Sequence, residues 1–384
     1  MSTFLDRPQA VLARRAIFQL HLWLGVLTGL YIFVVCATGA MLVFRLDLQR
    51  AMHPALFTPR TSGSLADPVA VMASVQKAYP DSRVSGVEAP TTTRPTYLAY
   101  AVNGDRFVTL LLDPVSAELL GEVPEQSFVR TLQDLHFDLL GGRRGRLVNG
   151  VGALVLLGMC VTGLVIWWPG TSNWTRSLRV DFSRQWRRVN RDLHSAVGFG
   201  TVALIAMWAA TGAYFVFPTP FRLAVNRISP LTRVATPQSK PAQAVASRPS
   251  WRALVDEAQR RVPGQHVARV VLPSSNTSPF LVMFSRVRPT PGNPELTSVY
   301  LDQYTGEAVT VPPPARPSAG DSVMAWLTPL HVGNFGGNGI RVAWLLLGMA
   351  PAVLFVTGFI MWWTRVVRVR WLRASRPAVE TAQP

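Results

Sequence analysis

The sequence is poor in charged residues and in cysteine. Only 15% of its 384 residues are charged, against about 25% in a typical soluble domain, so a membrane protein is favoured over an ordinary soluble one. Its two cysteines, Cys36 and Cys160, both lie inside apolar runs, which argues against a disulfide framework and a cysteine metal site. A dinucleotide fingerprint is also missing, because the glycines of 336–339 follow no predicted strand and lack its spacing.

Acidic residues are scarce relative to basic ones. The chain has 38 Lys and Arg against 21 Asp and Glu, a net charge of +17. Nucleic-acid binding is one interpretation of such a balance. The basic residues gather beside apolar runs, however, as in the cytoplasmic loops of membrane proteins. We therefore expect the partner to be the lipid bilayer and not nucleic acid.

Long apolar runs account for much of the composition. Four of them reach the length of about 20 residues that a helix needs to cross a bilayer, and they cover residues 18–44, 147–168, 194–217 and 341–363. The first is too long for the apolar region of a signal peptide, and no small-x-small cleavage site follows it. The predicted fold class is membrane α-helical, with four transmembrane helices.

Arginine density predicts the orientation of these helices. Residues 1–17, 169–193 and 364–384 are short segments dense in arginine, so we expect the connector and both termini to be cytoplasmic. The long segments 45–146 and 218–340 are then outside. Arg143, Arg144 and Arg146 oppose this assignment, but long loops cross the membrane largely regardless of charge.

The two outer segments resemble small α+β modules. Each contains one expected helix, at 67–79 and 251–262. Expected strands cover 96–102 and 106–112, joined by an Asn-Gly turn that favours a hairpin, and then 267–272, 280–284 and 298–301. Both modules end alike, in DPVSAE and DQYTGE. Residues 218–250 are rich in Pro, Ser and Ala, which predicts a loosely ordered link.

The chain contains an internal duplication. Residues 15–44 match 188–217 at 12 of 30 positions without gaps, and residues 135–168 match 330–363 at 10 of 34. His, Arg and Gly agree in register, which apolar composition alone does not produce. Two copies that run the same way through the membrane predict a pseudo-twofold axis along the membrane normal.

Four of the six histidines fall at matched positions. His21 matches His194 near the inner ends of two helices, and His136 matches His331 before the other two helices. Two imidazoles on one iron make a bis-histidine haem suited to electron transfer, so these residues predict two b-type haems, one toward each face. A zinc or copper site is the alternative, but it usually recruits three or four ligands. The unmatched histidines, His53 and His266, are interpreted as non-ligands.

Matched residues near the histidines suggest how a haem is accommodated. A glycine one turn after His21, Gly25, leaves room for a porphyrin, or else belongs to a helix-packing stripe. Four matched arginines are either partners of haem propionates or anchors at the membrane edge: Arg15, Arg188, Arg146 and Arg341. The Trp-Trp pairs at 167–168 and 362–363 are interpreted as interface belts.

These features resemble the PepSY-associated transmembrane family, and within it the inner-membrane siderophore reductases. The resemblance covers nearly the whole chain and rests on the matched Leu-His-x-x-x-Gly, Thr-Gly, Leu-His and Trp-Trp motifs and on the two outer modules. It implies two PepSY-like periplasmic modules and a di-haem protein of the bacterial inner membrane that reduces ferric siderophores. Some relatives carry a fused flavin reductase; none is expected here, so the donor is an unidentified quinol or cytoplasmic reductase.

A second class of function is compatible with the same sequence. The outer modules of a transport or assembly partner would bind a protein or peptide and transfer no electrons. Haem in the purified protein distinguishes the two.

Overall fold

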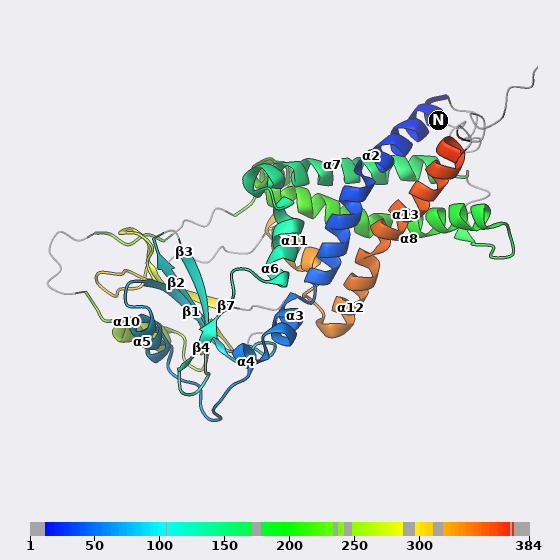
Figure 1. Cartoon of the computed structure of the whole chain (residues 1–384). Coiled ribbons are helices and arrows are strands. Elements are labelled where there is room, and N and C mark those ends of the chain that lie inside the picture. Colours follow the sequence, from blue (N-terminus) through cyan, green and yellow to red (C-terminus); the bar gives the residue numbers. More distant parts are fainter. Residues whose placement is uncertain are drawn as a thin grey trace, which may run out of the picture.

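The computed structural model describes residues 12–104, 106–170, 178–232, 237–241, 248–286, 296–309, 318–368 and 371. Within them, a bundle of long apolar helices stands beside an antiparallel sheet (Figure 1). The basic residues Arg7, Arg176, Arg370, Arg373 and Arg376, which contributed to the predicted orientation, lie outside the described residues.

The bundle contains four helical spans long and apolar enough to cross a membrane. They are α2 (Leu12–Leu42), α7 (Gly142–Trp167), α8 (Trp186–Val216), and a composite of α12 (Gly337–Gly348), α13 (Ala350–Trp362) and the π-helix η3 (Trp363–Val367). The predicted spans are confirmed, but the helices are longer at several ends. Helix α8 begins inside the predicted connector, where its first residues include three arginines, which are good helix formers when exposed.

The fourth span is interrupted near its middle. Met349 ends α12, and Pro351 lies in the first turn of α13. A proline has no N–H to continue the helical ladder, and it fits best in the first turn of a helix, where that N–H would have no partner. Pro351 therefore accounts for the break, and residues on both sides of it belong to one membrane-spanning segment.

The two ends of the bundle differ in what lies beside them. Helix α2 ends and α7 begins at the end next to the sheet, here called the sheet end, whereas α2 begins and η3 ends at the opposite, far end (Figure 1). Two short helices at the sheet end carry histidines: α6 (Phe128–Asp138) and α11 (Ala319–Val332). They pack on α2 and α8, respectively.

The strands form one seven-stranded sheet in the order β4-β3-β2-β1-β5-β6-β7. Their bounds are β1 (Arg83–Glu88), β2 (Tyr97–Asn103), β3 (Arg106–Leu112), β4 (Leu119–Glu122), β5 (His266–Val271), β6 (Phe280–Ser285) and β7 (Leu296–Leu301). The sequence predicted two small α+β modules and did not say how they are arranged. Antiparallel pairing of β1 with β5 joins their strands into a single sheet.

The seam between β1 and β5 has a steric and an ionic component. At Gly86 a Cβ atom would lie 2.7 Å from the carbonyl oxygen of Val270, so only glycine permits this approach. Glu88 of β1 forms an ion pair with Arg269, opposite it on β5, and another with Arg94 at 3.2 Å. These contacts tie the first half of the chain to the second.

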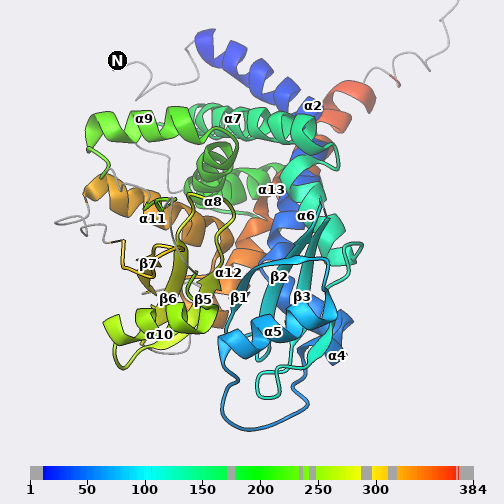
Figure 2. The same ribbon diagram turned by 90° about the vertical axis from the view of Figure 1, so that its left-hand side faces the viewer.

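One face of the sheet is covered by two helices, α5 (Pro68–Ala78) and α10 (Trp251–Arg261), on the side away from the bundle (Figures 1 and 2). Alternate strand residues such as Val87, Leu110 and Phe284 pack beneath them in one continuous core. The repeated module ends are structural turns: Asp113 accepts hydrogen bonds from Val115 and Ser116, and Asp302 accepts them from Tyr304 and Thr305.

Several elements differ from the sequence-based expectation. Strands β1 and β4 were not predicted. The expected loose link at 218–250 is wrong for its first part, where α9 (Pro218–Ile228) begins with proline in its first turn, a position that favours a helix start. Helices α3 (Arg45–Met52) and α4 (Pro54–Phe57) also lie in the first outer segment. Residues 233–236 and 242–247 of the link lie outside the described residues.

Candidate functional site

The sheet-end histidines face each other. His136 and His331 have ring centroids 6.2 Å apart and ring planes inclined by 50°. Each is carried by a short helix that stops soon afterwards in a left-handed residue, Leu139 or Gly333. The sequence predicted that these two histidines, from the two halves of the chain, pair as ligands, and the structure brings their rings close together.

Matched positions hold the ends of these short helices in place. The side chain of Asn149 on α7 donates to the carbonyl oxygen of His136 at 2.6 Å. At the position aligned with Asn149, the indole N–H of Trp344 donates to the carbonyl oxygen of Leu330 at 2.7 Å. Different donors at aligned positions thus bond a carbonyl at one histidine and a carbonyl one residue before the other, which helps to fix where each histidine backbone lies.

The far-end histidines share a cavity. His21 of α2 and His194 of α8 both line a partly open cavity of about 390 Å³, within the range of about 300–1,000 Å³ that small-molecule sites occupy. Gly25 and Gly198, one turn from each histidine, also line it. The remaining wall is mostly aliphatic and aromatic, which suits a flat apolar molecule.

Each histidine is held by a Thr-Gly pair on a neighbouring helix. Nδ1 hydrogen bonds join His21 to Thr162 at 2.9 Å, His194 to Thr357 at 2.8 Å and His331 to Thr211 at 2.7 Å. Nδ1 of His136 lies 2.9 Å from the carbonyl oxygen of Val35 and 3.5 Å from Thr38. The ring carbons rest on the glycines that follow these threonines, namely Gly163, Gly358, Gly212 and Gly39.

These bonds fix the tautomer of every ring. Thr162 donates its single proton to the carbonyl oxygen of Gly158 at 3.0 Å, and Thr357 donates to that of Val353 at 2.8 Å. Each hydroxyl can then only accept from imidazole, as the Val35 carbonyl can only accept from His136. Nδ1 therefore carries the proton and Nε2 keeps its lone pair, the arrangement found in metal-ligating histidines with a supporting partner.

The sheet-end pair has the dimensions for one metal ion between the rings. When one metal ion is bound between two imidazoles, the ring centroids are separated by two metal–nitrogen bonds of about 2 Å and two ring radii of about 1 Å, or about 6 Å. The observed separation of the ring centroids is 6.2 Å. No group of three or more His, Cys, Asp or Glu side chains able to share a metal ion occurs among the described residues. The donor set therefore fits a bis-histidine haem iron better than a zinc site, which needs about four ligands.

Burial keeps the sheet-end pair neutral. Desolvation lowers the pKa of His136, and desolvation together with the neighbouring charge of His136 lowers the pKa of His331 to about 3. Both rings are thus unprotonated at Nε2 at pH 7. A neutral imidazole is the form that ligates iron.

Gly39 is required for the position of His136. A Cβ atom on Gly39 would lie 2.6 Å from ring atom Cε1 of His136, whereas a Cβ atom on Gly212 would lie 3.8 Å from the same atom of His331. In the di-haem protein that the sequence predicts, we expect Gly39→Ala to displace the His136 ring and to lower haem content from about two to about one per chain, measured as pyridine haemochrome against protein. The matched control, Gly212→Ala, should retain about two; equal losses in both variants would contradict the steric argument.

The matched arginines occupy the edges of the bundle. Arg15 and Arg146 are exposed, Arg188 pairs with Asp192 at 3.0 Å, and Arg341 pairs with Asp47. Two other arginines, Arg191 and Arg365, line the far-end cavity together with Trp167 and Trp362. These two arginines are not matched between the two halves, so the alignment gave no signal for them.

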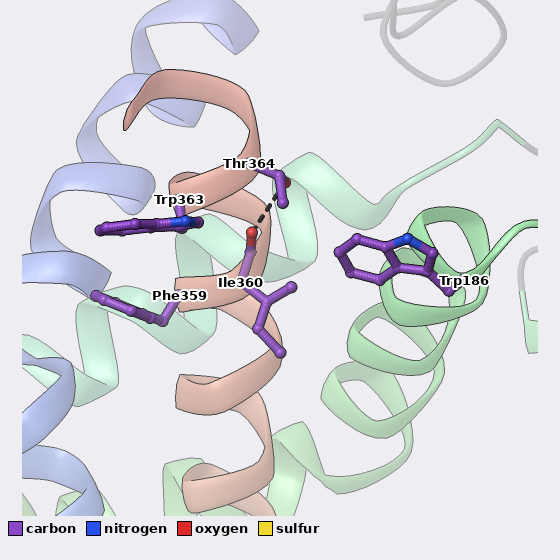
Figure 3. Close-up of a pocket in the computed structure, with 5 residues that line it drawn as sticks. All are labelled: Trp186, Phe359, Ile360, Trp363 and Thr364. Atoms are coloured by element: carbon purple, nitrogen blue, oxygen red, sulfur yellow. Dashed lines mark hydrogen bonds between the residues drawn. The ribbon is translucent and has the colours of Figure 1, made fainter. Parts of the chain in front are cut away.

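A second hollow lies near the far end of the fourth span. Figure 3 shows Trp186, Phe359, Ile360, Trp363 and Thr364 around an open groove of about 440 Å³. The Thr364 hydroxyl donates to the Ile360 carbonyl at 2.9 Å, so the groove offers almost entirely apolar surface. Such a face suits acyl chains and contributes no metal ligand.

The four apolar spans define a multi-pass membrane protein with an antiparallel sheet domain beside its helices. Within that class, the chain belongs to the family described as the PepSY-associated TM region, whose family model matches residues 18–365. The family resemblance inferred from the sequence is thus confirmed. No curated protein matches the chain.

Proposed function

We propose that this protein is a di-haem b electron-transfer protein that reduces ferric siderophores on the sheet side of the membrane. One observation carries the proposal: two neutral imidazoles, His136 and His331, face each other at 6.2 Å with both Nε2 atoms free to ligate. The far-end pair, His21 and His194, has the same tautomer and borders a cavity of ligand size.

The matched contacts support an origin by duplication. His21 rests on Thr162 and Gly163 as His194 rests on Thr357 and Gly358. The sheet-end pair repeats the arrangement on α2 and α8. Four ligands in two equivalent pairs make two b-type haems the expected content, and the two halves of the sheet are then two PepSY-like modules.

In this proposal, the residues of the chain hold the cofactor and supply no acid or base. The threonines and the Val35 carbonyl orient the imidazoles, and their hydrogen bonds raise the basicity of each Nε2. Bis-histidine haem, when bound, supplies one-electron transfer with no open iron position. The substrate Fe(III) gains one electron from a quinol or a cytoplasmic reductase, and oxygen chelators hold the resulting Fe(II) less tightly.

The proposed orientation places the sheet in the periplasm and both termini in the cytoplasm of a bacterial inner membrane. Its basis is the arginine density beside the far end of the bundle. A reporter that is active only in the cytoplasm should therefore work when fused after Pro384. Activity of a periplasm-specific reporter at that position would reverse the orientation.

The function is tested by spectra of the purified full-length chain. We expect a b-type absorbance band and about two haems per chain. Chemically reduced protein should reoxidise when a ferric hydroxamate siderophore is added, and a gallium-loaded siderophore, which accepts no electron, is the control. Colourless protein would leave the alternative, a partner whose sheet domain binds a protein or peptide.

A further inference from the structure

The far-end cavity changes in chemistry along its length. Toward the middle of the bundle its wall is apolar, with Gly29, Ile32 and Ile205 among the lining residues. Beyond the histidines, toward the far end, lie four polar or cationic side chains: Trp167, Trp362, Arg191 and Arg365. Their chain positions agree with this depth, because Trp167 and Trp362 each follow by one turn the glycine that contacts a histidine.

Two of these side chains are hydrogen-bond donors without acceptors. The indole nitrogens of Trp167 and Trp362 are buried, and neither has a hydrogen-bond partner among the described residues. The two tryptophans occupy aligned positions in the two halves of the chain. Buried indole N–H groups usually find a partner, because an unmet donor is unfavourable. Two unmet donors on one cavity therefore indicate an acceptor supplied by its occupant.

The charged residues at the far end of the cavity indicate that this acceptor is anionic. Arg191 and Arg365 line the cavity, and no Asp or Glu is among the described residues that line it. Arg191 lies 3.5 Å from Asp192 outside the lining, and its side chain stays half-exposed. Arg365 lies over the ring of Phe18 at 5.7 Å. Two cations and two free N–H donors make this end complementary to anionic oxygen atoms.

We infer that Trp167, Trp362, Arg191 and Arg365 form a carboxylate clamp that binds the two propionates of the haem held by His21 and His194. The inference rests on the proposed function. A haem is amphiphilic, with an apolar edge that suits the deep wall and a dicarboxylate edge that suits the clamp. In this arrangement each indole N–H donates to a carboxylate oxygen. Arg15 and Arg188, the partners predicted from the sequence, do not line the cavity.

The clamp is tested with a pair of porphyrins. Full-length protein carrying His136→Ala, which leaves His21 and His194 as the bis-histidine site, is prepared without haem and titrated with iron protoporphyrin IX or with its dimethyl ester. Trp167→Phe and Trp362→Phe keep an aromatic ring and remove the donor. Each should weaken binding of the free acid by roughly tenfold or more. Binding of the dimethyl ester should weaken much less, because a neutral ester carbonyl accepts a weaker hydrogen bond than a carboxylate. The control, Trp363→Phe, makes the same change at the apolar groove of Figure 3 and should alter neither affinity.

The outcomes separate the clamp from the proposed function. Equal weakening of the acid and the ester would mean that the indoles act by packing alone, and an unchanged affinity for the acid would mean that they do not contact it; both results overturn the clamp. Failure of the parent protein to bind either porphyrin would overturn the proposed function itself.

Discussion

A chain carrying His331→Ala should hold about one haem where the unsubstituted chain holds about two, and His136→Ala should remove the same one. Each imidazole occupies one side of a shared site, because the rings face each other at 6.2 Å. Either substitution would remove one of the two imidazoles that would hold the haem. His21→Ala and His194→Ala should each remove the other haem. Variants of the two histidines of one pair should therefore have the same absorbance spectrum, and the two pairs should differ.

The controls for this prediction are the two histidines outside both pairs. His53 joins α3 to α4, and His266 is exposed at the start of β5. His53→Ala and His266→Ala should keep about two haems. If the spectrum of His21→Ala instead matched that of His136→Ala, ligands would be paired within one half of the chain and the proposed pairing would be wrong.

His331→Ala should also abolish reduction of a ferric siderophore presented on the sheet side. The sheet-end pair is the one nearer that side, at the end of the bundle beside the sheet (Figure 1). The experiment uses oriented proteoliposomes with the reductant enclosed on the far side and the ferric siderophore outside. Release of Fe(II) to an external chelator measures the rate, while absorbance shows that the haem at His21 and His194 still becomes reduced.

The matched variant for this second prediction is Gly212→Ala. Its added Cβ atom would lie 3.8 Å from ring atom Cε1 of His331, which is an ordinary contact. It should reduce the siderophore at an unchanged rate. An unaltered rate in His331→Ala would show that electrons do not leave by the sheet-end pair, and that part of the proposal would have to be dropped.

Much of the fold could be predicted because its signals are local. Four apolar runs predicted the spans, and alternation with an Asn-Gly turn predicted β2 and β3. Strand β1 was missed because Gly86 weakens its pattern, and its role depends on β5 much later in the chain. The union of two modules into one sheet is a long-range contact that no local pattern specifies.

The candidate site was predictable only at the positions where the two halves of the sequence align. Aligned histidines pointed to two pairs, and the sheet-end pair meets as expected. The Thr-Gly pairs were visible in the alignment, yet their contact with the histidines depends on how helices pack. Trp167 and Trp362 were interpreted as interface belts, because the sequence alone does not show that they line a cavity or that their indole nitrogens are buried without a partner. Their alignment was the one signal that could have identified them.

Pairing of β1 with β5 also sets an order for biogenesis. The strand β1 is synthesised before α7 and α8, and its partner β5 follows them. During synthesis the edge of β1 therefore stays open until both intervening helices have entered the bilayer. An open strand edge pairs readily with other chains. The sheet can close only on a chain whose second and third spans have been inserted, so a misinserted chain keeps an unpaired edge that chaperones and proteases can recognise.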